Sequence, residues 1–287
     1  MCWLPTLNSE LPTFNQEMSD IIPRPAATVT LVRDTPQGFE VLMMQRNFQS
    51  IFMPGMHVFP GGAVDRHDSS EEIAALCTGF DDAQASRKLG IAGGGLAYWV
   101  AAIRESFEEA GILLACNDNG EIVTLDDAVR AERFHAYRRR VEHGEHPFSE
   151  MLKDEGLQLP LHHMTYFSHW ITPVGSPRRY DTRFFVAAAP EAQKPLHDNR
   201  ETINHVWVSP RAALDQHQQK KFDMRTPTIH TLRLFAEHEN VASLIKRLQA
   251  LGDIPVIEPR IAKDGRRVLP GDPDYEAAGT AIGRGIF

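Results

Sequence analysis

The stretch Arg104-Glu105-Ser106-Phe107-Glu108-Glu109-Ala110-Gly111-Ile112 decides how this sequence is interpreted. Glu105, Glu108 and Glu109 are three and four positions apart, and side chains at this spacing share one face of a helix. Their like charges repel each other, and Gly111 marks a helix C-terminus, where the helix dipole disfavours further negative charge. We therefore expect a compensating cation, and a hard divalent ion suits a set of carboxylates.

The apolar residues of the same helix lie on another face. They follow the 3.6-residue spacing of an amphipathic helix and are Leu96, Trp99, Val100, Ile103 and Phe107. At ~100° per residue, they centre on the side roughly opposite the glutamates. The pattern predicts a helix that packs on a core through one face and presents an acidic cluster on the other. A solvated charged face is the alternative, and the residues upstream argue against it.

Upstream of this helix, Phe59-Pro60-Gly61-Gly62 is followed by Asp68. Together these segments resemble the Nudix box, whose consensus runs Gly, five residues, Glu, seven residues, then Arg-Glu-hydrophobic-any-Glu-Glu-any-Gly-hydrophobic. There are three departures: Asp68 replaces the usual Glu, Ser106 replaces a hydrophobic residue, and residues 69–103 form a spacer of 35 residues instead of seven. An interrupted box of this kind is similar to the Nudix hydrolase subgroup typified by the peroxisomal coenzyme A diphosphatase of mammals.

This resemblance implies an α/β fold, specifically a Nudix-type α/β/α sandwich with a mixed sheet, helical insertions and an extra C-terminal helix. It implies that Glu105, Glu108 and Glu109 are catalytic and bind Mg²⁺ or Mn²⁺. It also implies structural roles for the other residues of the box, which are Gly61, Gly62, Asp68, Arg104 and Gly111, with Arg104 anchoring the loop by pairing with Asp68. The family often takes a further catalytic carboxylate from outside the box. Glu201 is the candidate here, and a loop carboxylate in solvent is the alternative.

Three arginines outside the box are the predicted substrate-binding residues, namely Arg46, Arg179 and Arg183. Guanidinium groups match the geometry of phosphate oxygens, and coenzyme A carries a 3′-phosphate that one of them could bind. Ordinary surface arginines are the alternative. The resemblance thus implies metal-dependent hydrolysis of coenzyme A or acyl-coenzyme A to 3′,5′-ADP and (acyl-)4′-phosphopantetheine. Another nucleoside diphosphate derivative, such as ADP-ribose or a dinucleotide, and a non-catalytic nucleotide-binding module are the alternatives.

The composition limits the partners and the compartment. A net charge of −8 argues against sequence-independent binding of nucleic acid, which depends on many Lys and Arg contacts to phosphates. A small anionic diphosphate is the predicted partner, because a metal and local arginines can reverse the field in one cleft. The three cysteines form no CxxC pair, which indicates a reducing compartment. The sequence contains no apolar run of about 18 residues, so we expect no membrane span. We expect a cytoplasmic location and leave the oligomeric state open.

The chain is expected to contain one Nudix domain over residues 21–251, with insertions near 69–95 and 117–160. An irregular segment, 1–20, precedes it, and an arm or tail, 252–287, follows it. Hydrophobic periodicity and turn residues predict strands at 26–33, 39–46, 57–59, 112–116, 164–172, 182–188 and 203–208. They predict helices near 72–78 and 82–89, helical structure over 125–152, a short helix from Ser209 and a longer helix over 227–251.

Two motifs remain outside these assignments. The triplet Gly93-Gly94-Gly95 is interpreted as a flexible join, with a phosphate-binding loop as the alternative, because no Lys-Ser/Thr pair follows it. The triplet Arg138-Arg139-Arg140 is interpreted as a solvated helix face, with a role toward a substrate or partner as the alternative.

Overall fold

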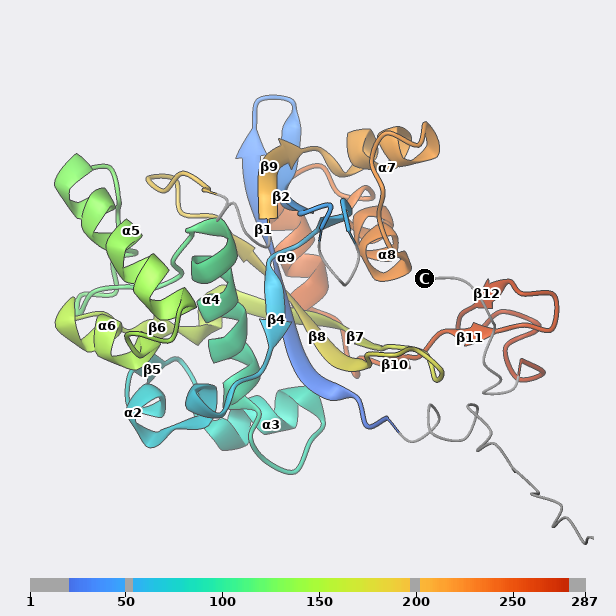
Figure 1. The fold of residues 1–287 in the computed structure, drawn as a ribbon, viewed down its shortest axis with the longest axis horizontal. Coiled ribbons are helices and arrows are strands. Elements are labelled where there is room, and N and C mark those ends of the chain that lie inside the picture. The colour runs from blue at the N-terminus through green and yellow to red at the C-terminus, as the bar shows by residue number, and fades with distance from the viewer. Residues whose placement is uncertain (1–20, 50–53, 197–201, 279–287) are drawn as a thin grey trace, which may run out of the picture. The chain divides into compact units, whose positions relative to one another are not determined.

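The computed structural model describes residues 21–49, 54–196 and 202–278 (Figure 1). The predicted segment 1–20 and the last residues of the predicted tail lie outside these ranges. The described residues form two compact units. The larger contains residues 24–170 and 181–256, and the smaller contains residues 21–23, 171–180 and 257–278.

The secondary structure alternates strands with helices. The strands are β1 (Arg24–Thr35), β2 (Gly38–Arg46), β3 (His57–Val58), β4 (Gly61–Ala63), β5 (Cys77–Thr78), β6 (Leu159–Pro160), β7 (Met164–Ile171), β8 (Tyr180–Ala188), β9 (Thr202–Val208), β10 (Val256–Ile257), β11 (Arg260–Ile261) and β12 (Arg267–Val268). The α-helices are α2 (Glu71–Ala74), α3 (Asp82–Leu89), α4 (Leu96–Ala110), α5 (Ala128–Glu142), α6 (Phe148–Asp154), α7 (Pro210–Gln218), α8 (Thr226–Phe235) and α9 (Val241–Gln249). Two short 3-10 helices span Arg66–Ser69 and Leu161–His163. None of the described helices is long and apolar enough to cross a membrane.

Strand β1 organises the main sheet, in which the strands follow the order β7-β8-β1-β2-β3. Its C-terminal part pairs antiparallel with β2 across a tight turn that places Thr35 opposite Gly38. Its N-terminal part pairs antiparallel with β4, so that Ala27 lies opposite Gly62 and Thr28 opposite Gly61. Strand β9 pairs with β2. This pairing places Gly61 and Gly62 of β4 directly beside β1, the central strand of the sheet.

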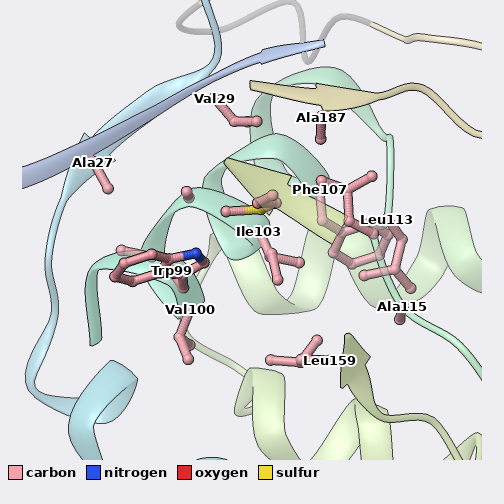
Figure 2. Packing of buried hydrophobic residues seen from close by; sticks show 14 of the residues in the cluster. Ala27, Val29, Trp99, Val100, Ile103, Phe107, Leu113, Ala115, Leu159 and Ala187 are labelled. Carbon is pink, nitrogen blue, oxygen red and sulfur yellow. The ribbon is translucent and has the colours of Figure 1, made fainter. Parts of the chain in front are cut away.

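Helices cover both faces of this sheet. Because side chains alternate between faces along a strand, alternate residues of each strand lie on the side of α4, and the residues between them lie on the side of α8. The first set lies in one core cluster with Trp99 and Ile103 and includes Ala27, Val29, Leu31, Leu42 and Met44. Figure 2 shows Ala27 and Val29 of this set beside α4. In the second set, the rings of Phe39 and Phe167 lie 6.5 Å and 5.4 Å from the ring of Phe235 in α8. The predicted α/β class and its sandwich of helices around a mixed sheet are confirmed.

The predicted apolar face of α4 is buried in full (Figure 2). The ring of Trp99 lies 4.7 Å from that of Phe185 in β8 and 5.1 Å from that of Phe80, so the helix packs on both the sheet and the first insertion. The opposite face carries the predicted acidic cluster and is not a solvated charged face, the alternative that the sequence analysis disfavoured. It is covered by β4, and Glu109 is only 6% exposed.

The predicted strand at residues 112–116 is wrong. These residues are buried, and the only strand-like pairing among them consists of isolated bridges from Cys116 to Ile122 and Gln158. The side chain of Gln193 takes the place of a neighbouring strand. Its oxygen accepts the N–H of Leu113, and its nitrogen donates to the carbonyls of Leu113 and Val123. A side chain that satisfies buried backbone groups leaves no strand pattern in the sequence.

Other differences concern helix ends. The single helix expected over 227–251 is two helices, because Asn240 caps α9 through the N–H of Ser243, and Asp34 accepts the N–H of Val241. The helical stretch 125–152 divides into α5 and α6 at Gly144, whose φ of 68° is left-handed. The segment expected as a helix over 72–78 leaves helical structure after Ala74 and continues into β5.

We expect Gln193→Ala to destabilise the protein by about 3 kcal/mol, because it leaves three buried backbone groups without a hydrogen bond. Chemical denaturation followed by circular dichroism measures this loss. Gln37→Ala is the matched control, because Gln37 is an exposed residue of the β1–β2 turn. Equal stability of the two variants would contradict the assigned role of Gln193.

Candidate active site

The C-terminus of helix α4, beside its glutamates, is capped by hydrogen bonds within the chain. Gly111 adopts a left-handed φ of 67° and donates its N–H to the carbonyl of Phe107. The hydroxyl of Ser106 donates to the carbonyl of Ile112 at 2.9 Å. A hydrogen bond to the following turn therefore explains why a polar residue occupies a fully buried position where the Nudix box usually has an apolar one.

The two glycines of β4 lie directly against the carboxylates of α4. The N–H of Gly61 donates to Oε2 of Glu109 at 3.0 Å. A Cβ at Gly62 would overlap the carboxylate of Glu105, and a Cβ at Gly61 would lie 2.6 Å from the carbonyl oxygen of Ala27. Glycine is thus required twice, for two reasons: Gly61 allows β4 to pair with β1, and Gly62 leaves room for a carboxylate.

Arg104 joins the two halves of the box. Its Nε and Nη2 donate to the two oxygens of Asp68 at 2.8 Å and 2.9 Å, and Nη2 also donates to the carbonyl of Ala63 at 3.0 Å. Its Nη1 donates to Glu105 at 2.8 Å and to Glu108 at 3.2 Å. The contact between Arg104 and Asp68 that the resemblance implied is therefore present, across 35 intervening residues.

The shorter carboxylate at position 68 reaches Arg104 because of the 3-10 helix that carries it. Asp65 caps this helix by accepting the N–H of His67, and Asp68 accepts the N–H of Asp65 at 2.7 Å. Asp68 is 2% exposed, and its bidentate contact with a guanidinium is the strongest geometry for such a pair.

Burial is the largest influence on the pKa values of Glu105 and Glu108. It raises the pKa of Glu105 to about 7, against the opposing charge of Arg104, and it raises the pKa of Glu108 in the same direction. Burial alone would lower the pKa of Arg104, but its hydrogen bond to Asp68 and the three neighbouring carboxylates raise it instead. Arg104 is therefore a permanent cation that faces three carboxylates.

The chemistry of this donor set fits a hard divalent cation, since Glu105, Glu108 and Glu109 offer oxygen ligands and concentrate negative charge on one stretch of helix. In the described ranges, however, no group of three or more His, Cys, Asp or Glu side chains is arranged as a metal site. Arg104 draws Glu105 and Glu108 together, while Glu109 is bound to the backbone of β4. Metal binding at these glutamates stays a prediction.

The predicted substrate arginines differ in their surroundings. Arg46 is half-buried at the end of β2, opposite Thr202. Arg183 is 3% exposed, pairs with Asp181 at 3.6 Å and lies over the ring of Tyr98, so contact with a substrate requires rearrangement. Their binding roles stay predictions.

Arg179 is held by contacts within the smaller unit. It donates to the carbonyls of Ile21 and Thr172 and pairs with Glu258 at 2.6 Å. These contacts explain its burial without a substrate. Glu201, the candidate for the extra carboxylate, lies outside the described residues.

The structure adds detail to two sequence interpretations at the ends of α4. The Gly93–Gly95 join is bound to α3 at its C-terminal part, because Asp82 accepts the N–H of Gly94 and Ser86 accepts that of Gly95. The basic triplet is not a uniform solvated face, because Arg138 is 7% exposed and donates to the backbone of α4. A helical periodicity argument would not separate Arg138 from Arg139, since α5 is polar on most of its surface.

Comparison with known proteins gives a consistent result. The family model of the NUDT19 Nudix domain matches residues 19–93 and 78–235. The acyl-coenzyme A diphosphatase NUDT19 of Xenopus laevis is 28% identical, over 85% of this chain and 73% of that protein. Its human counterpart is 27% identical, over 88% of this chain and 76% of that protein. The crystal structure of a NUDIX hydrolase from Alicyclobacillus acidocaldarius is similar with a TM-score of 0.67 and 26% identity, over 80% of this chain and 99% of that one.

The two glycines give opposite predictions for alanine substitution. Gly61→Ala forces a methyl group against the backbone of β1 and should lower the free energy of unfolding by about 1–3 kcal/mol. Gly62→Ala displaces the carboxylate at the end of the flexible Glu105 side chain and not the backbone, so the loss of stability should be smaller, about 1 kcal/mol, while turnover that depends on Glu105 falls about 10- to 100-fold. Thermal unfolding and a turnover assay separate the two effects. Gly93→Ala, where a Cβ meets open space, is the control.

Proposed function

This chain belongs to the NUDT19 Nudix domain family and is a Nudix hydrolase of phosphoanhydride bonds, and from that premise we propose that its substrate is coenzyme A or an acyl-coenzyme A. The products would be 3′,5′-ADP and 4′-phosphopantetheine or its acyl form. The observation that carries the proposal is the family match over residues 19–235, which includes both halves of the interrupted box. The relatives named acyl-coenzyme A diphosphatase support the choice of substrate.

We assign Glu105, Glu108 and Glu109 to the binding of Mg²⁺ or Mn²⁺. Their oxygen donors and clustered negative charge suit such an ion, which when bound neutralises charge on phosphoryl oxygens and lowers the pKa of a bound water. In the structure, Arg104 and the N–H of Gly61 hold these glutamates by hydrogen bonds. Positioning and charge stabilisation contribute most in phosphoryl transfer, because little covalent chemistry falls to the protein.

The reaction itself consumes one water. The water oxygen forms a bond to one phosphorus atom, the bridging P–O bond breaks, and the water gives up a proton. Glu201 is our candidate to accept that proton, and Glu108 is the alternative. Arg46, Arg183 and Arg179 remain candidates for phosphate groups away from the reacting bond. The free thiols of Cys77 and Cys116 are compatible with the cytoplasm, which we keep as the expected location.

A mass-spectrometric product screen tests this function. Purified full-length protein is incubated in ¹⁸O-labelled water with coenzyme A, acetyl-coenzyme A, ADP-ribose and a diadenosine polyphosphate, each with Mg²⁺, Mn²⁺ or a chelator. We expect metal-dependent cleavage of the coenzyme A substrates, with one ¹⁸O atom in one product, which identifies the phosphorus attacked. Cleavage of ADP-ribose or the dinucleotide alone would disprove the substrate assignment, and no cleavage of any compound would favour a binding module.

Substitution of Glu109 tests the assigned metal ligands. Glu109→Gln keeps an oxygen that can accept the N–H of Gly61 but removes the charge, so the fold should persist. We expect a loss in kcat of about 100-fold or more, since a charged ligand is removed from the reacting site. Glu132→Gln, at a side chain that is 74% exposed, is the matched control. Full metal-dependent turnover by Glu109→Gln would contradict the ligand assignment.

A further inference from the structure

We propose that Arg138, supplied by the second insertion, is a positioning residue that orients Glu108 and Glu109 through their backbone. The inference rests on the proposed function, because it concerns how these two glutamates are presented to a divalent ion. Arg138 lies in α5, outside the box. It therefore gives the insertion near 117–160 a part in the chemistry.

The geometry at the end of α4 carries this proposal. The last carbonyls of a helix have no partner within the helix. Nε of Arg138 donates to the carbonyl of Glu108 at 2.8 Å, and Nη2 donates to the carbonyl of Glu109 at 2.9 Å. The next carbonyl, that of Ala110, accepts the N–H of Leu196 at 2.8 Å. One guanidinium thus binds the two peptide groups that carry the candidate ligands.

The charge of Arg138 adds to this effect. The C-terminal end of a helix is its negative pole, and two glutamates in the last turn increase the unfavourable charge there. A buried guanidinium at the same end offsets both contributions. A rigid planar group with two bound carbonyls also restricts rotation of the last turn, and with it the direction in which the two side chains leave the helix.

The other end of α4 provides a structural comparison. Asp82 of the first insertion accepts the N–H groups of Gly94 and Leu96 at 3.0 Å and 2.9 Å. Asp82 therefore makes one hydrogen bond to the first residue of α4 and one to the segment just before it, whereas Arg138 makes two to the last turn. Leu96 lies twelve residues before Glu108, or ~18 Å along the helix axis. Loss of Asp82 should weaken the fold without changing the direction of the glutamates.

The test measures Mn²⁺ binding by electron paramagnetic resonance without substrate, and kcat, KM and melting temperature alongside it. We expect Arg138→Gln to weaken Mn²⁺ binding about tenfold and to lower kcat about tenfold, with KM for coenzyme A within about twofold, as for other residues that orient metal ligands. Arg138→Lys keeps the charge but offers a single donor group, so Mn²⁺ affinity and kcat should each fall about threefold. Asp82→Ala should lower the melting temperature while leaving Mn²⁺ affinity within about twofold.

Arg139→Gln is the control on α5, since Arg139 is 60% exposed. Mn²⁺ binding by Arg138→Gln as tight as by Arg139→Gln would overturn this inference and leave the proposed function intact. A similar loss of Mn²⁺ affinity in Asp82→Ala would also overturn it, because general stability would then explain the effect. If Arg138→Gln does not fold, Arg138→Lys provides the test. Unchanged Mn²⁺ affinity in Arg138→Lys would then contradict the positioning role of Arg138. Absence of Mn²⁺ binding by the unsubstituted protein would overturn both proposals.

Discussion

The burial of several carboxylates around one guanidinium is the constraint on which this structure depends. Glu105, Glu108 and Asp68 all contact Arg104, and each has little exposure to water. Buried like charges are costly unless they are paired and hydrogen-bonded. The chain meets this constraint with backbone groups as well as with Arg104, since Gly61 donates to Glu109 and the backbone of Asp65 donates to Asp68. The arrangement is therefore ordered, and one guanidinium faces three carboxylates, an imbalance that a divalent ion would correct.

Both insertions contribute to the same helix. The first contributes Asp82 and Ser86 at the start of α4, and the second contributes Arg138 at its end. A helix buried on nearly all sides cannot satisfy its terminal N–H and C=O groups with water, so other parts of the chain must do so. The insertions supply these partners while also adding aromatic residues, such as Phe80 and Phe134, to the core around the helix. They extend the scaffold of the candidate site and are not simple surface additions.

Periodicity and local chemistry allowed much of the fold to be predicted from the sequence. The apolar face of α4, the strands that became β1, β2 and β7 to β9, and the Ser209 cap of α7 depend on neighbouring residues, and these predictions are confirmed. The errors occur where a distant residue decides. The side chain of Gln193 hydrogen-bonds the backbone of Leu113 in place of a neighbouring strand, and Asp34 accepts an N–H group at the start of α9. Arg138 donates to the backbone of α4, unlike the exposed Arg139 beside it. For the candidate site, the family resemblance indicated the glutamates and the Arg104–Asp68 contact, but no local pattern marks a side chain that acts on the backbone of another element.

The ion pair between Arg104 and Asp68 has a consequence for how such sites are recognised. The two residues lie 36 positions apart, yet their atoms are 2.8 Å apart, and the chain between them folds as its own helices before returning. The ion pair fixes where the two ends of the connecting segment lie and sets no number of residues between them. A search that fixes the residue count between the two halves of the box would therefore miss this site, although Arg104 makes its contact with Asp68.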